Sequence, residues 1–188
     1  KMYKTWDEAA RTATDLAARL ASVLPEDREV LVLPPFTALK AVADAFAGRP
    51  GFAVGGQDFY LARQGAFTGE ISPTQLQDLG CAYALTGHSE RRHVLGESDE
   101  LVGKKTAFGV QEGLMVILCV GETLEERQTG RVEEVLTRQL DWGLAGLKEA
   151  GADRVAVAYE PVWAIGTGEV AGPKDIEAAH GFIRGVLA

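Results

Sequence analysis

Short apolar runs alternate with helical patterns along the chain, and this alternation constrains the fold more than any other feature. The runs are rich in Val and Ala, are bounded by Gly or Pro, and cover residues 30–33, 52–54, 81–85, 114–120 and 154–159. Such near-continuous apolar strands are typical of parallel sheets that are buried on both faces. An open doubly wound sheet and a (β/α)8 barrel both fit repeated strand–helix units of this kind.

Six helical patterns accompany the runs. The first covers residues 5–24, and Thr5 and Glu8 predict a capping box at its start. Its apolar stripe consists of Ala9, Ala13, Leu16, Leu20 and Val23. The other patterns begin near residues 36, 72, 99, 123 and 173, and the one from 123 is expected to continue as one region to about residue 150.

Length, composition and charge indicate the kind of domain and argue against some classes of function. With 188 residues and 46% hydrophobic content, the chain suits a single domain over residues 1–188 with a real core. Its net charge of −8 argues against general binding to nucleic acids or anionic membranes. Two cysteines without a CxxC spacing make a disulfide framework unexpected and favour the cytosol.

Functional groups of both architectures lie at the C-terminal ends of the strands, which draws attention to Glu160. This carboxylate follows the last apolar run and precedes an unusually apolar loop. Glycines border that loop on one side and a proline on the other, as in a lid that closes over a ligand. Closure would remove water from Glu160 and raise its pKa. The alternatives are a solvated carboxylate and a loop packed into the core or against another subunit.

His88 follows the third apolar run, after a glycine that permits a sharp turn. Ser89 is expected to cap a short helix there, and the helix dipole disfavours a cationic His88 beside it. A neutral imidazole at this position can donate a hydrogen bond to a carbonyl oxygen. The alternative is a turn histidine in an ordinary polar network. Glu90, Arg91 and Arg92 are expected to form supporting ion pairs.

Other candidates are weaker. Cys119 has no histidine near it in sequence and is interpreted as a small buried residue. His93 and His180 lack metal-ligand spacing, so no metal site is expected. A long glycine-rich stretch, residues 57–69, is interpreted as a contact loop because such loops in compact domains are usually functional or part of an interface.

Two motifs carry a family resemblance. AYEPVWAIGTG (158–168) and LTGHSERR (85–92) closely resemble the active-site segments of triosephosphate isomerases. GAFTGE (65–70) and CVGE (119–122) agree with the same family in the same order, and KM at the start is similar to the end of its Asn-x-Lys-Met segment. The resemblance covers the entire chain.

This resemblance implies a (β/α)8 barrel and the interconversion of dihydroxyacetone phosphate and D-glyceraldehyde 3-phosphate through an enediolate, in glycolysis and gluconeogenesis. Glu160 resembles the catalytic base, His88 the electrophile, Lys1 the lysine that stabilises the anionic substrate, and Glu90 the support beside that lysine. Gly166 resembles the donor to the substrate phosphate. The segment that resembles the lid comprises Pro161, Val162, Trp163, Ala164, Ile165, Gly166, Thr167 and Gly168. The segment that resembles a loop inserting into a second subunit, and so implies a homodimer, includes Phe67, Thr68, Gly69 and Glu70.

Proton transfer between adjacent carbons needs a base, a carbonyl-polarising donor and a cation or dipole for the oxyanion, so no cofactor is expected. Compared with the family pattern, the first strand and the last two strand–helix units are missing. We therefore expect an internal fragment with about five strands and six helices, whose edge strands make it unstable and nearly inactive alone. The alternative function is a non-catalytic barrel fragment that only binds phosphate or a partner chain.

Overall fold

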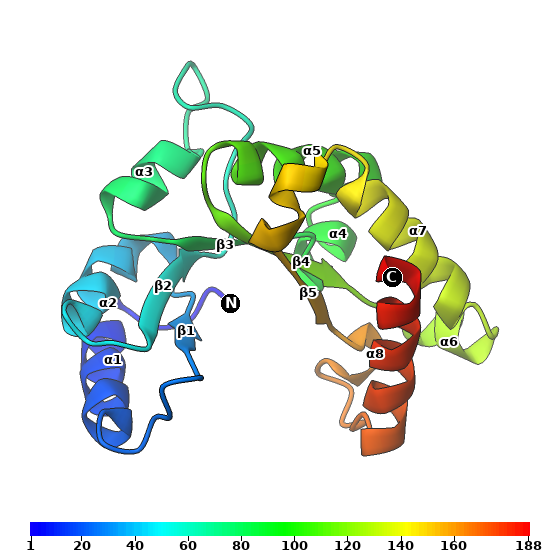
Figure 1. The fold of residues 1–188 in the computed structure, drawn as a ribbon, viewed down its shortest axis with the longest axis horizontal. Helices are drawn as coiled ribbons and strands as arrows, with labels where there is room; N and C mark the ends of the chain where they lie inside the picture. Colours follow the sequence, from blue (N-terminus) through cyan, green and yellow to red (C-terminus); the bar gives the residue numbers. More distant parts are fainter. The chain divides into compact units, whose positions relative to one another are not determined.

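The computed structural model describes the backbone of residues 1–188 and the side chains of residues 1–148 and 151–188. Its strands are β1 (Val30–Val32), β2 (Phe52–Gly56), β3 (Tyr83–Thr86), β4 (Met115–Val120) and β5 (Val155–Tyr159). They form one sheet in the order of the sequence, with β1 and β5 at its edges (Figure 1). β1 pairs with β2 and β2 with β3, both in parallel, and Val30 lies opposite Phe52. The five apolar runs are thus confirmed as strands.

Helices follow the strands as expected. They are α1 (Trp6–Leu20), α2 (Leu39–Phe46), α3 (Pro73–Asp78), α4 (Ser89–His93), α5 (Asp99–Gln111), α6 (Leu124–Gln128), α7 (Val132–Leu144) and α8 (Pro173–Leu187). Three 3-10 helices, η1 (Phe36–Ala38), η2 (Glu149–Arg154) and η3 (Val162–Ala164), complete the chain. In the part of the chain that the structure describes, no helix is both long and apolar enough to span a bilayer.

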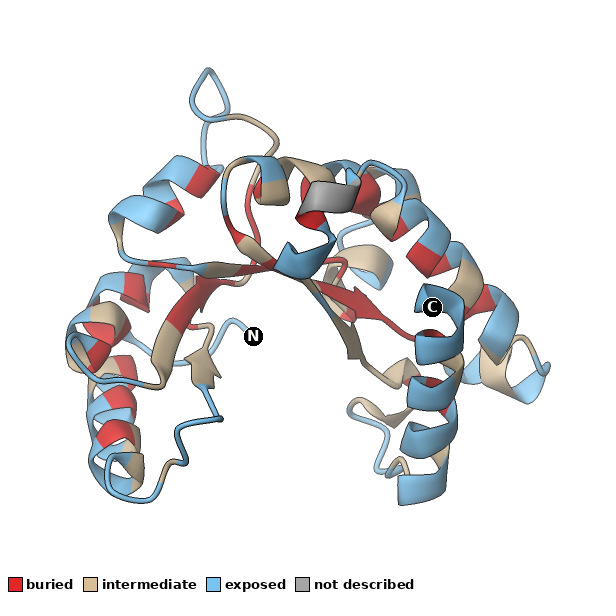
Figure 2. Cartoon of the chain, in the orientation of Figure 1, coloured by how far each residue is buried: buried red, intermediate tan, exposed pale blue. Residues whose placement is uncertain are grey.

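The chain divides into two compact units. Unit 1 comprises Lys1–Leu85 and Gly109–Val116, and unit 2 comprises Thr86–Phe108 and Ile117–Ala188. In unit 1, α1 packs against α2 and buries Ala9, Ala13 and Ala17. Figure 2 shows buried (red) positions along this helix, separated by exposed ones. Alanines at this spacing let two helices approach closely and bury apolar surface from both.

The core of unit 2 lies between β4 and the helices that cover it. Leu118 and Val120 of β4 are buried against Leu136 and Leu140 of α7, together with Val102 of α5. Ala179 and Ile183 of α8 complete this cluster. These contacts fix the C-terminal end of β4, which lies next to the candidate site described below.

Two local predictions were wrong in detail. The first helix ends at Leu20, and Val23 is 66% exposed because it lies beyond the helical stripe. The pattern from 123 to 150 forms two helices, α6 and α7, because Gly130 adopts a positive φ of 71° that interrupts the helix. The second of these ends at Leu144.

Candidate active site

His88 and Glu160, which are 72 positions apart in the sequence, lie side by side in unit 2. His88 directly precedes α4, and Glu160 follows the last residue of β5. The Nε2 atom of His88 is 3.0 Å from Oε1 of Glu160. The backbone N–H of Ser89 donates to Oε2 of the same carboxylate at 3.0 Å. Both side chains are 21% exposed, so the pair is mostly buried and still reached by solvent.

The hydrogen bonds of His88 define its tautomer. Nδ1 accepts a hydrogen bond from the backbone N–H of Glu90 at 3.3 Å. A nitrogen that accepts cannot carry a proton, so the proton of a neutral ring is on Nε2, the atom that faces Glu160. His88 itself is therefore the cap of α4, and the expectation that Ser89 caps this helix was wrong. The imidazole accepts at the helix N-terminus because that end of a helix presents free N–H groups.

The pKa of Glu160 results from opposing effects. Burial raises it, but the hydrogen bonds from His88 and from the backbone of Ser89 lower it more, and the net pKa lies below the ordinary value. The increase expected on lid closure is therefore absent in this conformation. A raised pKa would require both hydrogen bonds to break while the carboxylate stays out of water.

The backbone of Glu160 is held against the end of β4. Its N–H donates to the carbonyl of Val120 at 2.8 Å. A Cβ atom at Gly121 would lie 1.8 Å from the carbonyl oxygen of Glu160, so only glycine fits there. Gln139 of α7 binds both backbone groups of Gly121, accepting from its N–H at 2.8 Å and donating to its carbonyl at 3.2 Å. Helix α7 thus fixes the surface on which Glu160 lies.

The apolar loop after Glu160 is anchored inside unit 2 near its start, by its third residue. Trp163 is buried, and its indole N–H donates to Oε1 of Glu122 at 2.8 Å. Glu122 is fully buried and also accepts from the Tyr159 hydroxyl at 3.0 Å and from Arg127 at 3.2 Å. The guanidinium of Arg127 lies 4.4 Å from the centre of the Trp163 ring. Sequence reasoning assigned no function to Glu122, although it follows an apolar strand as Glu160 does.

The rest of the loop is more exposed. Gly166 and Gly168 have positive φ angles of 70° and 85°, and both are exposed. The hydroxyl of Thr167 donates back to the carbonyl of Trp163 at 2.8 Å. One end of the segment is thus anchored by a buried indole, and the other end has the backbone freedom that a moving loop requires.

Cys119 is close to the site and is unreactive in this setting. Burial and the nearby Glu160 carboxylate together raise the pKa of its thiol to about 12, despite the opposing charge of Arg92. At neutral pH the group is therefore a thiol and not a thiolate, so it is a poor nucleophile. Both cysteines are free and buried, as the sequence predicted for Cys119. Within the described residues, no group of three or more His, Cys, Asp or Glu side chains is arranged to hold a metal ion.

The remaining predicted residues, Lys1 and Glu90, belong to different units. Lys1 is exposed in unit 1, where its carbonyl accepts from the side chain of Gln57 at 3.1 Å. Glu90 is in unit 2, with its carboxylate 3.8 Å from Nδ1 of His88. The ion pairs expected of the two arginines are confirmed: Arg91 binds Glu97, and the side chain of Arg92 binds that of Asp99. The roles of Lys1 and Glu90 toward a substrate stay predictions.

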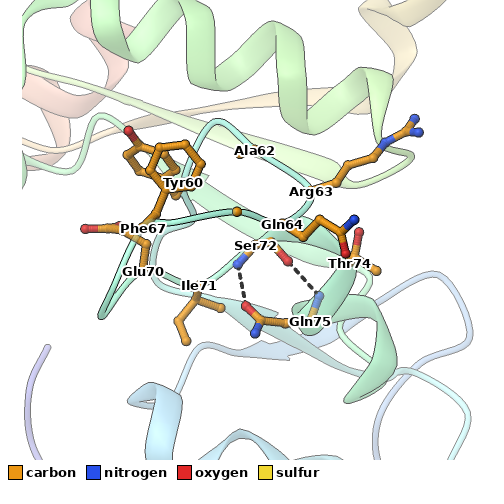
Figure 3. A pocket seen from close by; sticks show the side chains of 11 residues that line it. Tyr60, Ala62, Arg63, Gln64, Phe67, Glu70, Ile71, Ser72, Thr74 and Gln75 are labelled. Carbon is orange, nitrogen blue, oxygen red and sulfur yellow. Dashed lines mark hydrogen bonds between the residues drawn. The ribbon is translucent and has the colours of Figure 1, made fainter.

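The predicted contact loop has no helix or strand between Gly56 and Pro73. The N–H of Tyr60 donates to the carbonyl of Ile71 at 2.8 Å and closes the base of the loop. The ring of Phe67 lies 4.5 Å from that of Tyr60, beside a pocket of about 360 Å³ (Figure 3). Residues 63–70 are exposed, as a loop that contacts a partner requires.

Comparison with known proteins identifies the family. The family model described as triosephosphate isomerase matches residues 1–188. The chain belongs to the triosephosphate isomerase family. It is 63% identical over 188 residues to a triosephosphate isomerase of Nitratidesulfovibrio vulgaris (strain DSM 19637 / Miyazaki F), covering all of this chain and 75% of the relative. It is 51% identical over 187 residues to that of Roseiflexus castenholzii and 47% identical over 188 residues to that of Chloroflexus aurantiacus, covering 72% and 74% of these relatives.

The family resemblance predicted from the sequence is thereby confirmed. So is the fold class, because residues 1–188 of this triosephosphate isomerase family member form five strands of an incomplete (β/α)8 barrel. His88 and Glu160 then lie where such barrels carry their chemistry, at the C-terminal ends of strands.

Proposed function

We propose that the protein is a triose-phosphate isomerase that interconverts dihydroxyacetone phosphate and D-glyceraldehyde 3-phosphate. The observation that carries the proposal is the approach of Glu160 to His88, with 3.0 Å between Oε1 and Nε2, in a member of this family. A carboxylate base and a neutral imidazole at one site are the two groups that this reaction needs at adjacent carbons.

In this proposal His88 polarises the substrate carbonyl. Its Nε2–H already faces the site, because Nδ1 accepts from the helix backbone. A neutral donor stabilises negative charge on the enediolate oxygen through a hydrogen bond in a partly buried site. A substrate oxygen would take the place that Oε1 of Glu160 occupies in this conformation.

Glu160 moves the proton between the two carbons. To do so, its carboxylate must exchange the hydrogen bonds to His88 and Ser89 for contact with the substrate. Loss of these two bonds removes the largest effects that lower its pKa, while burial continues to raise it. Substrate binding would in this way make Glu160 a stronger base at the moment when a base is needed.

Other groups complete the proposed site. The segment from Pro161 to Gly168 closes over the substrate, and the N–H of Gly166 donates to its phosphate. Lys1 stabilises the anionic substrate, with Glu90 as its support. The family motifs support all of these assignments. The lid is supported in addition by the loop itself, which is anchored at Trp163 and exposed from Gly166 onward.

The proposal extends to assembly and compartment. The loop with Phe67, Thr68, Gly69 and Glu70 inserts into a second copy of the chain, giving a homodimer. Its exposed tip supports this proposal. Two free cysteines suit the cytoplasm, where thiols stay reduced.

A coupled triose-phosphate assay on the intact protein that contains residues 1–188 tests the function. Glu160→Asp withdraws the carboxylate by one methylene, and a displacement of about 1 Å costs on the order of 100-fold in kcat. Glu169→Asp is the matched control, because Glu169 is an exposed glutamate at the end of the same loop. Turnover of Glu160→Asp equal to that of the control removes Glu160 from the mechanism. If the unmodified protein folds but shows no turnover, the alternative function, a non-catalytic protein that only binds phosphate or a partner chain, is favoured.

A further inference from the structure

Arg92 is a cation with little access to water. Its side chain is 7% exposed and lies in unit 2, between the end of β3 and the end of β4. Nε donates to the carbonyl of Gly87 at 2.7 Å, and Nη2 donates to the carbonyl of Cys119 at 3.2 Å. Nη1 forms an ion pair with Asp99, the first residue of α5.

Charge neutralisation alone does not explain this arrangement. A buried guanidinium costs several kcal/mol unless it is paired, and Asp99 supplies the pairing charge. The two bonds to backbone carbonyls are made in addition, from separate nitrogens of one rigid plane. A planar group with fixed donors imposes a geometry on the groups that it binds.

One carbonyl belongs to the segment that carries His88, and the other belongs to β4, whose end contacts the backbone of Glu160. Gly87 immediately precedes His88, and it adopts a positive φ of 67°. A Cβ at Gly87 would lie 2.6 Å from Nη2 of Arg92, so the guanidinium packs directly on this turn. Cys119 is two residues before Gly121, which touches the backbone of Glu160.

We propose that Arg92 is a positioning residue that sets the angle and distance between the His88 imidazole and the Glu160 carboxylate. It acts through the backbone of the two strand ends and does not touch the reacting atoms. The proposal rests on the proposed isomerase function for its catalytic consequence, but its structural part is independent of any reaction.

The test compares Arg92→Lys with Arg138→Gln in the intact protein. Lysine keeps the charge beside Asp99, but a single ammonium cannot reproduce two donors in a fixed plane. Arg138 is the matched control because its Nε binds the other oxygen of Asp99 at 2.9 Å, and it is 43% exposed. We expect Arg92→Lys to lower kcat on the order of 10- to 100-fold with little change in KM, because misplacement affects the reacting geometry more than binding. Arg138→Gln is expected to keep the parent kcat.

A folded Arg92→Lys variant with the parent kcat overturns the proposal. Equal losses in both variants also overturn it, because the ion pairs with Asp99 would then be the cause. If Arg92→Lys does not fold, Asp99→Asn takes its place: Arg92 keeps its two carbonyl bonds, so the parent kcat is expected, and a loss as large as 10-fold would contradict the proposal.

An NMR measurement separates this proposal from the isomerase function. The imidazole nitrogen resonances of His88 report its hydrogen bonds in the absence of substrate. We expect them to shift in Arg92→Lys and to stay unchanged in Arg138→Gln, even if the protein proves to have no isomerase activity. Unchanged His88 resonances in both variants would refute the positioning role by themselves.

Discussion

Glu122 offers the sharpest test of how the loop after Glu160 is anchored. Its fully buried carboxylate accepts hydrogen bonds from Trp163, Tyr159 and Arg127. Replacing Glu122 by Gln keeps the shape and one acceptor oxygen but removes the charge. Replacing it by Leu removes every acceptor and leaves the indole and the phenol without their partner in the core.

The expected losses follow from these contacts. Hydrogen bonds to a charged group contribute about 1.5–3 kcal/mol each and neutral ones about 0.5–1.5 kcal/mol, so Glu122→Gln should cost about 2 kcal/mol after allowance for non-additivity. Glu122→Leu leaves the buried indole and the half-buried phenol unpaired, at about 1–3 kcal/mol each, and the total is about 4 kcal/mol. The charge of Arg127 adds little, because this side chain is 31% exposed and also pairs with Asp175.

Urea unfolding of the intact protein measures both variants against Glu125→Gln. Glu125 lies in α6, three residues after Glu122, and its side chain is 85% exposed. Its replacement should therefore change stability by less than about 0.5 kcal/mol. For a chain of this size, the Leu variant should lose roughly 8–16 °C in Tm. If Glu122→Leu and Glu125→Gln unfold at the same urea concentration, the buried carboxylate does not hold the loop and the reasoning fails.

Two further predictions concern other buried groups. Burial raises the pKa of Glu97, but hydrogen bonds from Lys105 and Arg91 lower it by more than burial raises it, so the folded-state pKa is below the ordinary value. Its contribution to stability is therefore fully present above the ordinary glutamate pKa of about 4.3 and is lost as the pH falls through the lower folded-state pKa. In a plot of the urea midpoint against pH, Glu97→Gln should reduce the slope on the acid side. An unchanged slope would contradict this prediction. Gly121→Ala places a methyl group within 1.8 Å of a backbone carbonyl, so we expect a loss of at least about 2 kcal/mol, and an alanine variant as stable as the parent would show that β5 can move away.

Local sequence patterns predicted the elements well where they depend on nearby residues. Thr5 and Glu8 form the predicted capping box at the start of α1, where the backbone N–H of Thr5 donates to the Glu8 carboxylate at 2.8 Å. The helix from 123 was predicted as one region because its polar and apolar residues continue past Gly130. A glycine in a helical pattern is compatible both with a continuous helix and with a break, and the sequence does not distinguish them.

The sequence drew attention to two groups that follow strands, whose roles stay predictions, but not to the groups that support them. Glu160 comes directly after an apolar run, and His88 comes shortly after another, in the turn that begins with Gly87. Gln139 and Arg92 lie on helices, and nothing in their immediate sequence shows which backbone groups they bind. The cap of α4 was assigned to Ser89 because serine is the better capping residue in general. In the structure His88 accepts the bond instead, and the other nitrogen of its ring faces Glu160.

The sequence alone determined the alternation of strands and helices and the family, and it singled out the two residues proposed for chemistry, because these depend on periodicity and on motifs within a dozen residues. The tertiary structure decided the tautomer of His88, the lowered pKa of Glu160 and the contacts of Arg92. Each of these depends on groups brought together from strands far apart in the chain, and the energies of burial and hydrogen bonding that set them exist only once the core has formed.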